Sequence, residues 1–465
     1  MAKYDPKTVT PMSKTRKGNT SSTSTDSERC HSQVIYGDSY HKKTIPVFND
    51  NESARLCFRG KTGSGESVLI PFSDQALSKH LMLIGSIGTG KTTTINQYLT
   101  EVRKQIKTDD VVIVFDTKGD YLKFYQHGDV IIGNDDLYLE QKGIKNNYWN
   151  IFAEIESGKR MLESIREISN ALFKEACERT NQPFFPNAAK DILCAVMWHF
   201  MKTRKPTERT NRSLTEYLCS NSNLVNDLIK MLDSYDEFRS MKSYISNSTS
   251  AQTQGVIAEL QQVINQYFQG NFNKHGTLSL RRLTEQKGGR FIFIEYDMSI
   301  GSVLSPIYSL MFDMAIKQAL SRTKANGNVF FVTDEFRLLP NLVHIDDAVN
   351  FGRSLGVKFL ISIQNVNQIF ENYGEHRARS IMSGFMTTIT FNVSDVHTRD
   401  YIKSCFGNNR KKDSFETIIS TKGINEETRE GFVVEDWDIS RLDLGEAIIK
   451  MPGHEPFFFK FDMTE

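Results

Sequence analysis

Short apolar runs recur along the chain and predict the strands of a buried sheet. The clearest span residues 81–84, 111–115, 290–294, 329–332 and 357–363. They lack polar alternation, which is typical of parallel strands covered on both faces. Further strands are expected at residues 388–393, 446–452 and 456–461. We therefore predict an α/β fold with a mostly parallel central sheet.

Between residues 158 and 282 the pattern changes to helical periodicity, as at Leu224, Leu228 and Met231. We interpret this range as an all-α domain inserted into the sheet-forming domain, which is thereby divided into residues 33–157 and 283–465. Residues 1–32 are rich in Ser, Thr, Lys and Arg and are predicted to form a disordered basic tail. That tail is either simply solvated or in contact with DNA or anionic lipid.

A phosphate-binding motif follows the first apolar run. Residues 85–92 match G-x-x-x-x-G-K-[ST] at every fixed position, with a predicted helix after them. The glycines let backbone N–H groups point at phosphate oxygens, and the helix start adds partial positive charge. Lys91 would reach the β- and γ-phosphates of ATP, and the Thr92 hydroxyl would ligate Mg²⁺. The predicted ATP-binding residues are Gly85, Ser86, Ile87, Gly88, Thr89, Gly90, Lys91, Thr92 and Thr93.

A second glycine-rich stretch, residues 59–66, lacks the G-K-[ST] ending. Strand-like residues flank it on both sides, so we predict a hairpin turn there rather than a phosphate site.

An acidic pair ends the predicted strand at residues 329–332. Asp334 would hold Mg²⁺, and Glu335 would orient and polarise an attacking water. The other interpretation is a helix N-cap, but a phosphate-binding motif in the same chain favours catalysis. The long separation between Lys91 and Asp334 is explained by the helical insertion.

Two more polar residues are candidates for the same chemistry. Arg353 lies on a predicted helix from which it cannot obviously reach its own phosphate, so we predict an arginine finger for an adjacent subunit. Gln364 ends the next strand and would sense the γ-phosphate. Asp116 and Lys118 follow the strand at 111–115 and lie either near the nucleotide or in a solvated turn.

Charge and cysteine content narrow the function classes. The net charge is +1, so any DNA-binding surface must be local rather than spread over the chain. The six cysteines form no C-x-x-C pair, which favours a reducing cytoplasm and argues against a zinc site. No apolar run reaches the ~20 residues that a bilayer-spanning helix needs, and the polar start of the chain lacks a signal peptide.

Together these stretches resemble a known family, the coupling-protein ATPases of conjugative DNA transfer and type IV secretion, within the FtsK/HerA group of P-loop motors. The resemblance extends from about residue 68 to the C-terminus, and the order and spacing of its motifs are more specific than the phosphate loop alone. The stretches that carry it are residues 80–94, 112–122, 147–155, 276–294, 332–342, 347–369 and 373–374.

The resemblance implies a RecA-like nucleotide-binding domain and a hexameric ring around DNA, with ATP between subunits. Arg353 matches the family's trans-acting arginine and Gln364 its sensor. The helical insertion corresponds to a domain that recognises a relaxase or another DNA-processing protein in relatives. Typical members begin with transmembrane helices, where this chain has a polar tail. We therefore expect a soluble variant in the cytoplasm, either free or peripheral at the inner face of the membrane through a separate membrane subunit.

The leading hypothesis is an ATP-hydrolysing translocase that recruits and pumps DNA, or a DNA–protein substrate, during conjugative transfer. A second hypothesis places a soluble HerA-like motor in phage defence or DNA processing, with a nuclease partner. A third is a nucleotide-dependent module that recruits substrates without pumping.

Overall fold

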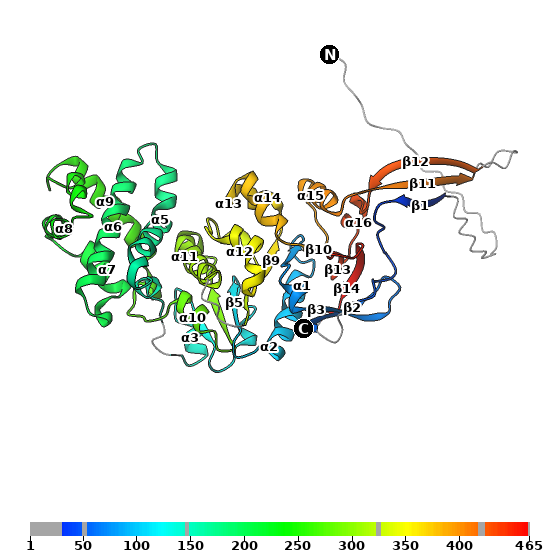
Figure 1. The fold of residues 1–465 in the computed structure, drawn as a ribbon, viewed down its shortest axis with the longest axis horizontal. Coiled ribbons are helices and arrows are strands. Elements are labelled where there is room, and N and C mark those ends of the chain that lie inside the picture. Colours follow the sequence, from blue (N-terminus) through cyan, green and yellow to red (C-terminus); the bar gives the residue numbers. More distant parts are fainter. Residues whose placement is uncertain (1–29, 49–53, 145–147, 322–326, 417–423, 464–465) are drawn as a thin grey trace, which may run out of the picture. The chain divides into compact units, whose positions relative to one another are not determined.

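The computed structural model describes residues 30–48, 54–144, 148–321, 327–416 and 424–463 (Figure 1). These form two compact units, which are described separately. The smaller unit draws on residues 30–37, 409–416 and 424–431, and the larger one on the other described residues. Among the helices of the described residues, we find none that combines the length and the apolar character of a membrane-spanning segment.

The larger unit is built on an 11-stranded sheet in the order β3-β2-β14-β13-β10-β4-β9-β8-β5-β7-β6. Neighbouring strands from β10 to β6 are parallel, and those from β3 to β10 are antiparallel. This confirms the predicted α/β fold with a mostly parallel sheet and a helical domain. The strands are β2 (Ala54–Lys61), β3 (Ser67–Ser73), β4 (Leu81–Ile84), β5 (Val111–Asp116), β6 (Val130–Ile132), β7 (Arg290–Glu295), β8 (Val329–Thr333), β9 (Val357–Ile363), β10 (Thr387–Thr390), β13 (Glu446–Lys450) and β14 (Phe457–Phe461).

The glycine-rich stretch at residues 59–66 is a hairpin, as predicted. β2 and β3 pair antiparallel, and Gly65 takes a positive φ of 88° in the turn between them. This arrangement leaves residues 85–92 as the phosphate-loop candidate.

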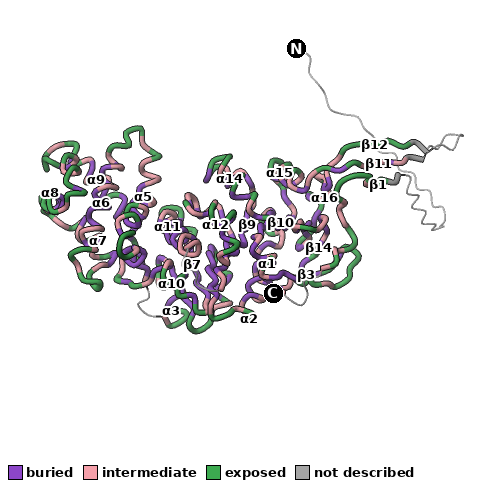
Figure 2. Tube along the Cα trace, viewed as in Figure 1, coloured by how far each residue is buried: buried purple, intermediate pink, exposed green. Residues whose placement is uncertain are grey.

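Alternate strand residues feed two apolar cores, one on each face of the sheet. The strands of the central sheet are largely buried (Figure 2). In β5, Val112 and Val114 belong to one core, and Ile113 and Phe115 to the other. α2 (Lys91–Gln105) contributes Tyr98 to the first core. The second core includes residues of α11 (Gly301–Ala319), α12 (Ile345–Phe351), α13 (Val366–Tyr373) and α14 (Glu375–Ser383). Both faces are therefore covered, which explains the uninterrupted apolar runs in the sequence.

Helices dominate the range that we interpret as an inserted domain. They are α5 (Met161–Arg179), α6 (Phe184–Thr203), α7 (Asn211–Cys219), α8 (Leu224–Asp233), α9 (Ala251–Tyr267) and α10 (Leu280–Gln286). α6 packs against α5 and α9, and α5 contacts α11. Their apolar residues therefore join the core on the α11 side of the sheet. The remaining α-helices described are α1 (Asp74–Leu77), α3 (Leu137–Gln141), α4 (Ile151–Glu154), α15 (Val396–Phe406) and α16 (Asp436–Ser440).

One buried carboxylate joins the chain on either side of the helical range. Glu154 is fully buried and accepts hydrogen bonds from Trp149 Nε1 (2.8 Å), Ser279 Oγ (2.8 Å) and the backbone N–H of Leu280 (2.7 Å). The Arg281 backbone N–H is a further donor. Glu154 precedes the helical range, whereas Ser279, Leu280 and Arg281 lie at its end. This carboxylate therefore fixes where the helices leave and rejoin the sheet domain.

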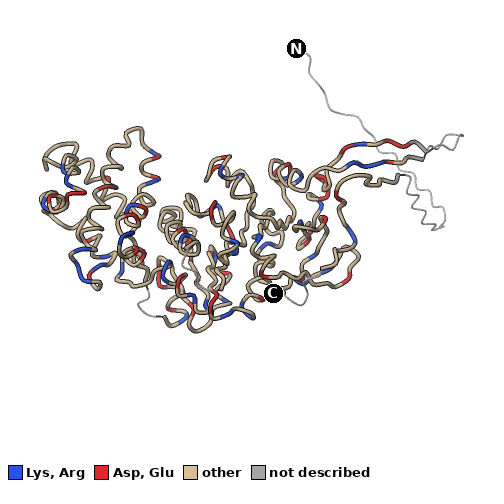
Figure 3. The backbone as a smooth tube through the Cα atoms, viewed as in Figure 1, with Lys and Arg blue, Asp and Glu red and all other residues tan. Residues whose placement is uncertain are grey.

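The smaller unit is a three-stranded sheet in the order β1-β11-β12, formed by β1 (Cys30–Tyr36), β11 (Asn408–Glu416) and β12 (Ile424–Phe432). Basic residues on β11 face acidic residues on β12 (Figure 3), with ion pairs Arg410–Glu430 (3.1 Å) and Lys412–Glu426 (2.8 Å). Residues 408–412 would read as a basic turn from composition, but they belong to a strand because the backbone of β11 pairs with β1 on one side and β12 on the other. Most of the predicted tail, residues 1–29, lies outside the described residues, and β1 begins within its last part.

Candidate functional site

The predicted phosphate loop lies between β4 and α2. Gly88 and Gly90 have positive φ values of 75° and 115°, which glycine adopts without strain. Lys91 begins α2 and folds back over the loop, donating hydrogen bonds to the carbonyls of Gly85 (2.6 Å) and Ser86 (2.7 Å). The loop therefore presents a buried ammonium at a helix start, the arrangement that binds phosphate.

Distant parts of the chain brace this loop. The Ser86 N–H donates to the carbonyl of Asn392 (2.8 Å), just after β10. The N–H of Gly445 donates to the carbonyl of Thr89 (3.1 Å), just before β13. A Cβ on Gly85 would lie 2.7 Å from the Cβ of Phe391, so only glycine fits there.

A cavity of about 410 Å³ opens beside the loop. It brings together most of the residues that the motifs predict, which are Ile87, Gly88, Gly90, Lys91, Thr92, Thr93, Asp334, Glu335 and Gln364. Thr117, Lys118, Met298, Arg337, Leu338, Leu444 and Met463 complete the lining. Gly85, Ser86 and Thr89 hold the loop through the backbone contacts above.

Strand geometry explains why the acidic pair and Gln364 meet. β8 and β9 are parallel neighbours, so the residues that follow them lie at the same sheet edge. Gln364 Nε2 donates a hydrogen bond to Glu335 Oε2, and Arg337 Nε lies 3.2 Å from Glu335 Oε1. Both carboxylate oxygens of Glu335 are therefore held.

Burial sets the protonation of this site. It raises the pKa of Glu335, whereas the charge of Arg337 and the hydrogen bond from Gln364 oppose the rise. It also raises the pKa of Asp334, against the charges of Lys118 and Lys91. The pKa of Lys91 is lowered by burial, and the charges of Glu335 and Asp334 oppose that fall. The two acids and the lysine thus depend on one another to stay charged.

The oxygen donors beside Lys91 suit Mg²⁺. Thr92 offers a hydroxyl at the start of α2, and the buried Asp334 offers a carboxylate in the same cavity. Hydroxyl and carboxylate oxygens are hard ligands, and Mg²⁺ typically takes one or two from protein beside substrate phosphates and water. The donor set therefore fits this ion.

The structure separates the roles of Asp116 and Lys118. The Asp116 carboxylate accepts hydrogen bonds from four backbone N–H groups, those of Lys118, Gly119, Asp120 and Tyr121, so it shapes a turn. Lys118 is exposed and lines the cavity. Asp116 therefore fits the interpretation as a turn residue, whereas Lys118 fits the interpretation as a residue near the nucleotide.

Two of the residues that sequence reasoning missed act on the acidic pair. Tyr121 is buried beside Asp334 and Thr92, and burial followed by the charge of Asp334 raises its pKa well above its usual value. Arg337 pairs with Glu335, as described above. No motif marks Tyr121, whereas the proximity of Arg337 to the acidic pair in the sequence was an available signal.

Arg353 lies away from this cavity. It belongs to a 3₁₀ helix, η8 (Gly352–Leu355), at the amino end of β9, and it is exposed. Gln364 follows the other end of this seven-residue strand, which spans about 23 Å at ~3.3 Å per residue. Arg353 lines a different cavity, together with Asn328 and Lys358. Arg353 is therefore remote from the phosphate loop of its own chain. This agrees with the expectation from the sequence that it cannot reach its own phosphate.

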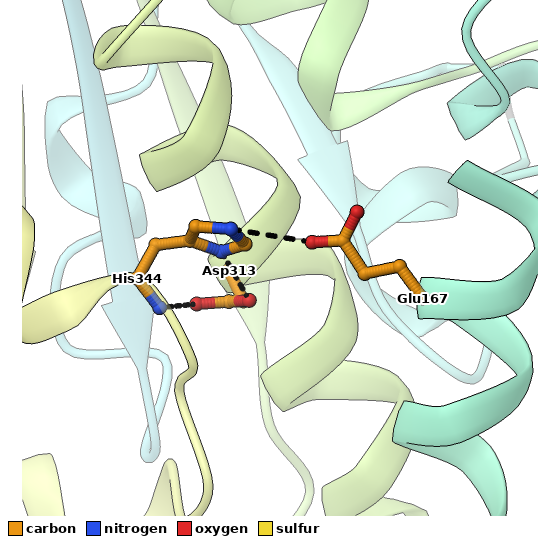
Figure 4. Close-up of side chains that lie close together, drawn as sticks. All are labelled: Glu167, Asp313 and His344. Carbon is orange, nitrogen blue, oxygen red and sulfur yellow. Dashed lines mark hydrogen bonds and ion pairs between the residues drawn. The ribbon is translucent and has the colours of Figure 1, made fainter. Parts of the chain in front are cut away.

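A second charged cluster joins α5 to α11 (Figure 4). His344 Nδ1 lies 2.8 Å from Asp313 Oδ2, and His344 Nε2 lies 3.3 Å from Glu167 Oε1. The His344 N–H donates to Asp313 Oδ1 (2.9 Å), and Lys317 pairs with Glu167 Oε2 and with Glu156 (3.1 Å). The donor atoms of His344, Asp313 and Glu167 lie close enough to hold a metal ion. However, each oxygen of Asp313 and Glu167 already faces an N–H donor, so this is an ion-pair network.

Comparison with known protein families gives a match over most of the chain, including the residues of the cavity beside Lys91 up to Leu444. The model of the family described as type IV secretion-system coupling protein DNA-binding domain matches residues 66–458. The chain belongs to this family. The resemblance to coupling proteins that the motifs carry is thereby confirmed.

The individual coupling proteins that the chain resembles have low sequence identity to it. Coupling protein TraD of Escherichia coli (strain K12) is 21% identical over 346 residues, which cover 70% of this chain and 43% of TraD. The chain thus spans less than half the length of that relative. The unbound monoclinic form of the bacterial conjugative coupling protein TrwBdeltaN70 gives a TM-score of 0.68 at 18% identity, covering 85% of this chain and 87% of the TrwBdeltaN70 chain. TrwB in complex with ADP and Mg²⁺ gives 0.65 at 18% identity, covering 85% and 88%. These structures share the fold of the coupling-protein family with this chain.

Proposed function

We propose that this chain binds ATP with Mg²⁺ in the cavity beside Lys91 and hydrolyses it to move DNA, or a DNA–protein substrate, in conjugative transfer. The observation that carries the proposal is the meeting of Lys91, Asp334, Glu335 and Gln364 at one cavity in a coupling-protein chain. TrwB, a structural neighbour, was solved with ADP and Mg²⁺, which supports the nucleotide.

The residues divide the work of hydrolysis. Lys91 and the loop N–H groups bind the phosphates, and Thr92 and Asp334 hold Mg²⁺, which neutralises phosphate charge. Glu335 polarises the attacking water, and Gln364 holds Glu335 and senses the γ-phosphate. Phosphoryl transfer depends mainly on positioning and charge, so a rigid sheet edge is a suitable frame for these groups.

Assembly and partners extend the proposal. We place ATP between subunits of a hexameric ring, with Arg353 of one subunit acting at its neighbour's site. Residues 158–282 would form the domain that receives a relaxase or another DNA-processing protein, inserted between residues 33–157 and 283–465. We place the protein in the cytoplasm, at the inner face of the membrane when a separate membrane subunit holds it there. Membership of the coupling-protein family favours this role over a defence motor with a nuclease partner.

ATP turnover by the purified 465-residue chain, with and without DNA, tests the proposal. We expect DNA to stimulate turnover, and Lys91→Ala and Glu335→Gln to abolish it. Lys104→Ala is a matched control, because Lys104 is an exposed lysine at the far end of α2. An oligomer with neither DNA binding nor DNA-stimulated turnover would overturn the proposal.

Movement is tested separately from hydrolysis. A translocase should displace a protein roadblock from DNA, and this displacement should require an intact Lys91 and Glu335. ATP turnover without displacement would instead favour the module that recruits substrates without pumping.

A further inference from the structure

The cavity beside Lys91 has a wall that no motif describes, formed by Leu444 and Met463. These residues are 55% and 47% exposed, so both side chains leave apolar surface open to the cavity. Phosphate is bound by N–H groups and cations, and Mg²⁺ by oxygen ligands. A leucine and a methionine suit neither, so this apolar wall needs a different ligand group.

The order of strands explains why these two residues meet. β13 runs antiparallel to β10, which is parallel to β4, so β13 starts at the edge where β4 ends. β14 runs antiparallel to β13, which brings the end of β14 to that same edge. Leu444 lies two residues before β13, and Met463 lies two residues after β14. The apolar wall therefore stands at the sheet edge that carries the phosphate loop.

Hydrogen bonds attach both segments of the wall to the phosphate loop and α2. The N–H of Gly445 donates to the carbonyl of Thr89 in the loop (3.1 Å). Gln97 of α2 donates its Nε2 to the carbonyl of Asp462 (2.7 Å). The N–H of Phe461 donates to the carbonyl of Gly445 (2.9 Å), which joins one segment to the other. The apolar wall thus has a fixed position beside the loop.

The sheet also gives a bound nucleotide a direction. β9 and β8, which lead to Gln364 and Glu335, lie on one side of β4, whereas β10, β13 and β14 lie on the other. A γ-phosphate held at Gln364 and Glu335 leaves the nucleoside, at the opposite end of the molecule, to extend toward β13. Since neighbouring strands are ~4.8 Å apart, β13 is about 10 Å from β4, within reach of a nucleotide.

The other exposed apolar residues of the cavity lie elsewhere along this edge. Ile87 belongs to the phosphate loop itself, and Met298 follows β7, which lies beyond β8 on the side of the acidic pair. Leu444 and Met463 are therefore the exposed apolar pair on the side to which the nucleoside extends.

A nucleobase matches the chemistry of the apolar wall. The faces of its ring are apolar enough to pack on leucine, and the thioether of methionine makes favourable contacts with aromatic rings. Covering two partly exposed side chains also removes apolar surface from water. Ligand sites commonly combine such walls with a few well-placed polar groups, which the phosphate loop supplies here.

We propose that Leu444 and Met463 form the base subsite of the nucleotide cavity, which takes a purine by packing on its ring. The inference rests on the proposed ATP-binding function and adds the part of the ligand that the phosphate-loop motif does not describe. Neither side chain can donate a hydrogen bond to the edge of a base. Adenine and guanine nucleotides should therefore bind alike.

Ligands that cannot be hydrolysed at the γ-phosphate separate the base from the phosphates. Isothermal titration calorimetry with Mg²⁺ gives the Kd of ADP, GDP and inorganic pyrophosphate for the 465-residue chain. Leu444→Ala and Met463→Ala should each raise the Kd of ADP about three- to ten-fold, because apolar contact with the base is lost. The Kd of pyrophosphate, which has no base, should change by less than about two-fold. ADP and GDP should agree within about three-fold.

Two exposed residues outside this cavity supply matched controls. Leu69 is 55% exposed and Met386 is 51% exposed, close to the values of the residues that they match. Leu69→Ala and Met386→Ala should leave the Kd of all three ligands unchanged. A general loss of affinity from removing a surface side chain is thereby distinguished from loss of the subsite.

The results separate this inference from the proposed function. If the affinity for pyrophosphate falls in parallel with that for ADP, the wall supports the loop rather than a base, and the inference is overturned. Unchanged affinity for ADP in both variants also overturns it. If the unaltered chain binds neither ADP nor pyrophosphate, the proposed function itself fails. A selective loss of ADP affinity in a chain without ATP turnover would leave the base subsite standing and remove the proposed hydrolysis.

Discussion

Gln364 donates its side-chain amide to Glu335 Oε2, joining the ends of two neighbouring parallel strands. The candidate sensor and the candidate base are therefore one hydrogen-bonded unit. If a bound phosphate displaces Gln364, the Glu335 carboxylate loses or changes this hydrogen bond directly.

Replacing Gln364 should impair chemistry more than binding. Gln364→Ala leaves one oxygen of Glu335 unheld, so we expect kcat to fall roughly 10- to 100-fold with a smaller change in KM. Gln364→Glu should be worse, because a second carboxylate disfavours ionisation of Glu335. Steady-state kinetics of both variants, beside the exposed Gln75→Ala as control, test this.

Gln364 and Arg337 hold opposite oxygens of the same carboxylate, so their effects should not add. We expect the double variant Gln364→Ala/Arg337→Ala to depart from the sum of the two single losses in ln kcat. Strict additivity would contradict a shared action through Glu335.

Arg353 should act at the nucleotide site of a neighbouring subunit, which mixed assemblies can test. Neither Arg353→Ala nor Lys91→Ala alone should hydrolyse ATP at more than about a thousandth of the normal rate. Subunits of the two variants mixed in one ring should recover part of the activity, because some interfaces then combine an intact loop with an intact arginine. ATP turnover at several mixing ratios measures this.

A control mixture makes that experiment decisive. Lys91 and Glu335 belong to the same cavity, so subunits with Lys91→Ala and Glu335→Gln form no complete site on mixing. Recovery in this control, or none in the Arg353 mixture, would contradict action across the interface.

His344 should make stability depend on pH. Burial lowers the pKa of His344, but its hydrogen bond to Asp313 and the charges of Asp313 and Glu167 outweigh this and raise the pKa, against the charge of Lys317. A raised folded-state pKa gives stability that is complete below the unfolded value of ~6.5 and is lost as pH rises through the folded value.

Thermal unfolding of His344→Gln across pH 5.5 to 8.5 tests this. The variant should be less stable than the unaltered chain by about 1.5–3 kcal/mol at the acidic end. The difference should shrink toward the alkaline end, as the imidazole of the folded protein loses its proton. A gap independent of pH would mean that His344 contributes packing rather than charge.

Glu154 should be among the costliest single positions for stability. Glu154→Gln replaces one accepting oxygen with a donor that faces other donors, so we expect a loss of about 2–4 kcal/mol. Chemical denaturation measures it, with Glu163→Gln as control, because Glu163 is an exposed residue of α5. A change in the free energy of unfolding within about 0.5 kcal/mol would show that the hydrogen bonds of Glu154 are not needed for stability.

The sequence predicted the parts of the site that follow from strand ends. The apolar run before Asp334 and the one before Gln364 are adjacent parallel strands, so their carboxyl ends had to meet at one edge. The motif from Gly85 to Thr92 likewise predicted a phosphate-binding loop between a strand and a helix. Arg337 was missed because a single arginine two residues after the acidic pair belongs to no motif, and its contact with Glu335 becomes visible only in the structure.

Other features depend on partners far away in the chain. β11 reads as a polar turn locally, but its backbone is paired with β1 and β12, and ion pairs such as Lys412–Glu426 add cross-strand contacts. The carbonyl of Asn392 and the N–H of Gly445, which brace the phosphate loop, belong to segments with no motif of their own. No local pattern encodes such contacts, because they arise from the order of strands in the sheet.

The position of β4 in the sheet has a consequence for synthesis on the ribosome. β4 ends at Ile84, whereas its two neighbours, β9 and β10, begin at Val357 and Thr387. At ~5–20 residues per second, the roughly 270 residues to β9 take on the order of 10–60 s to emerge. During that time the apolar strand that carries the phosphate loop has no partner. The nascent chain therefore exposes an unpaired apolar strand throughout that time, which is the kind of surface that chaperones bind.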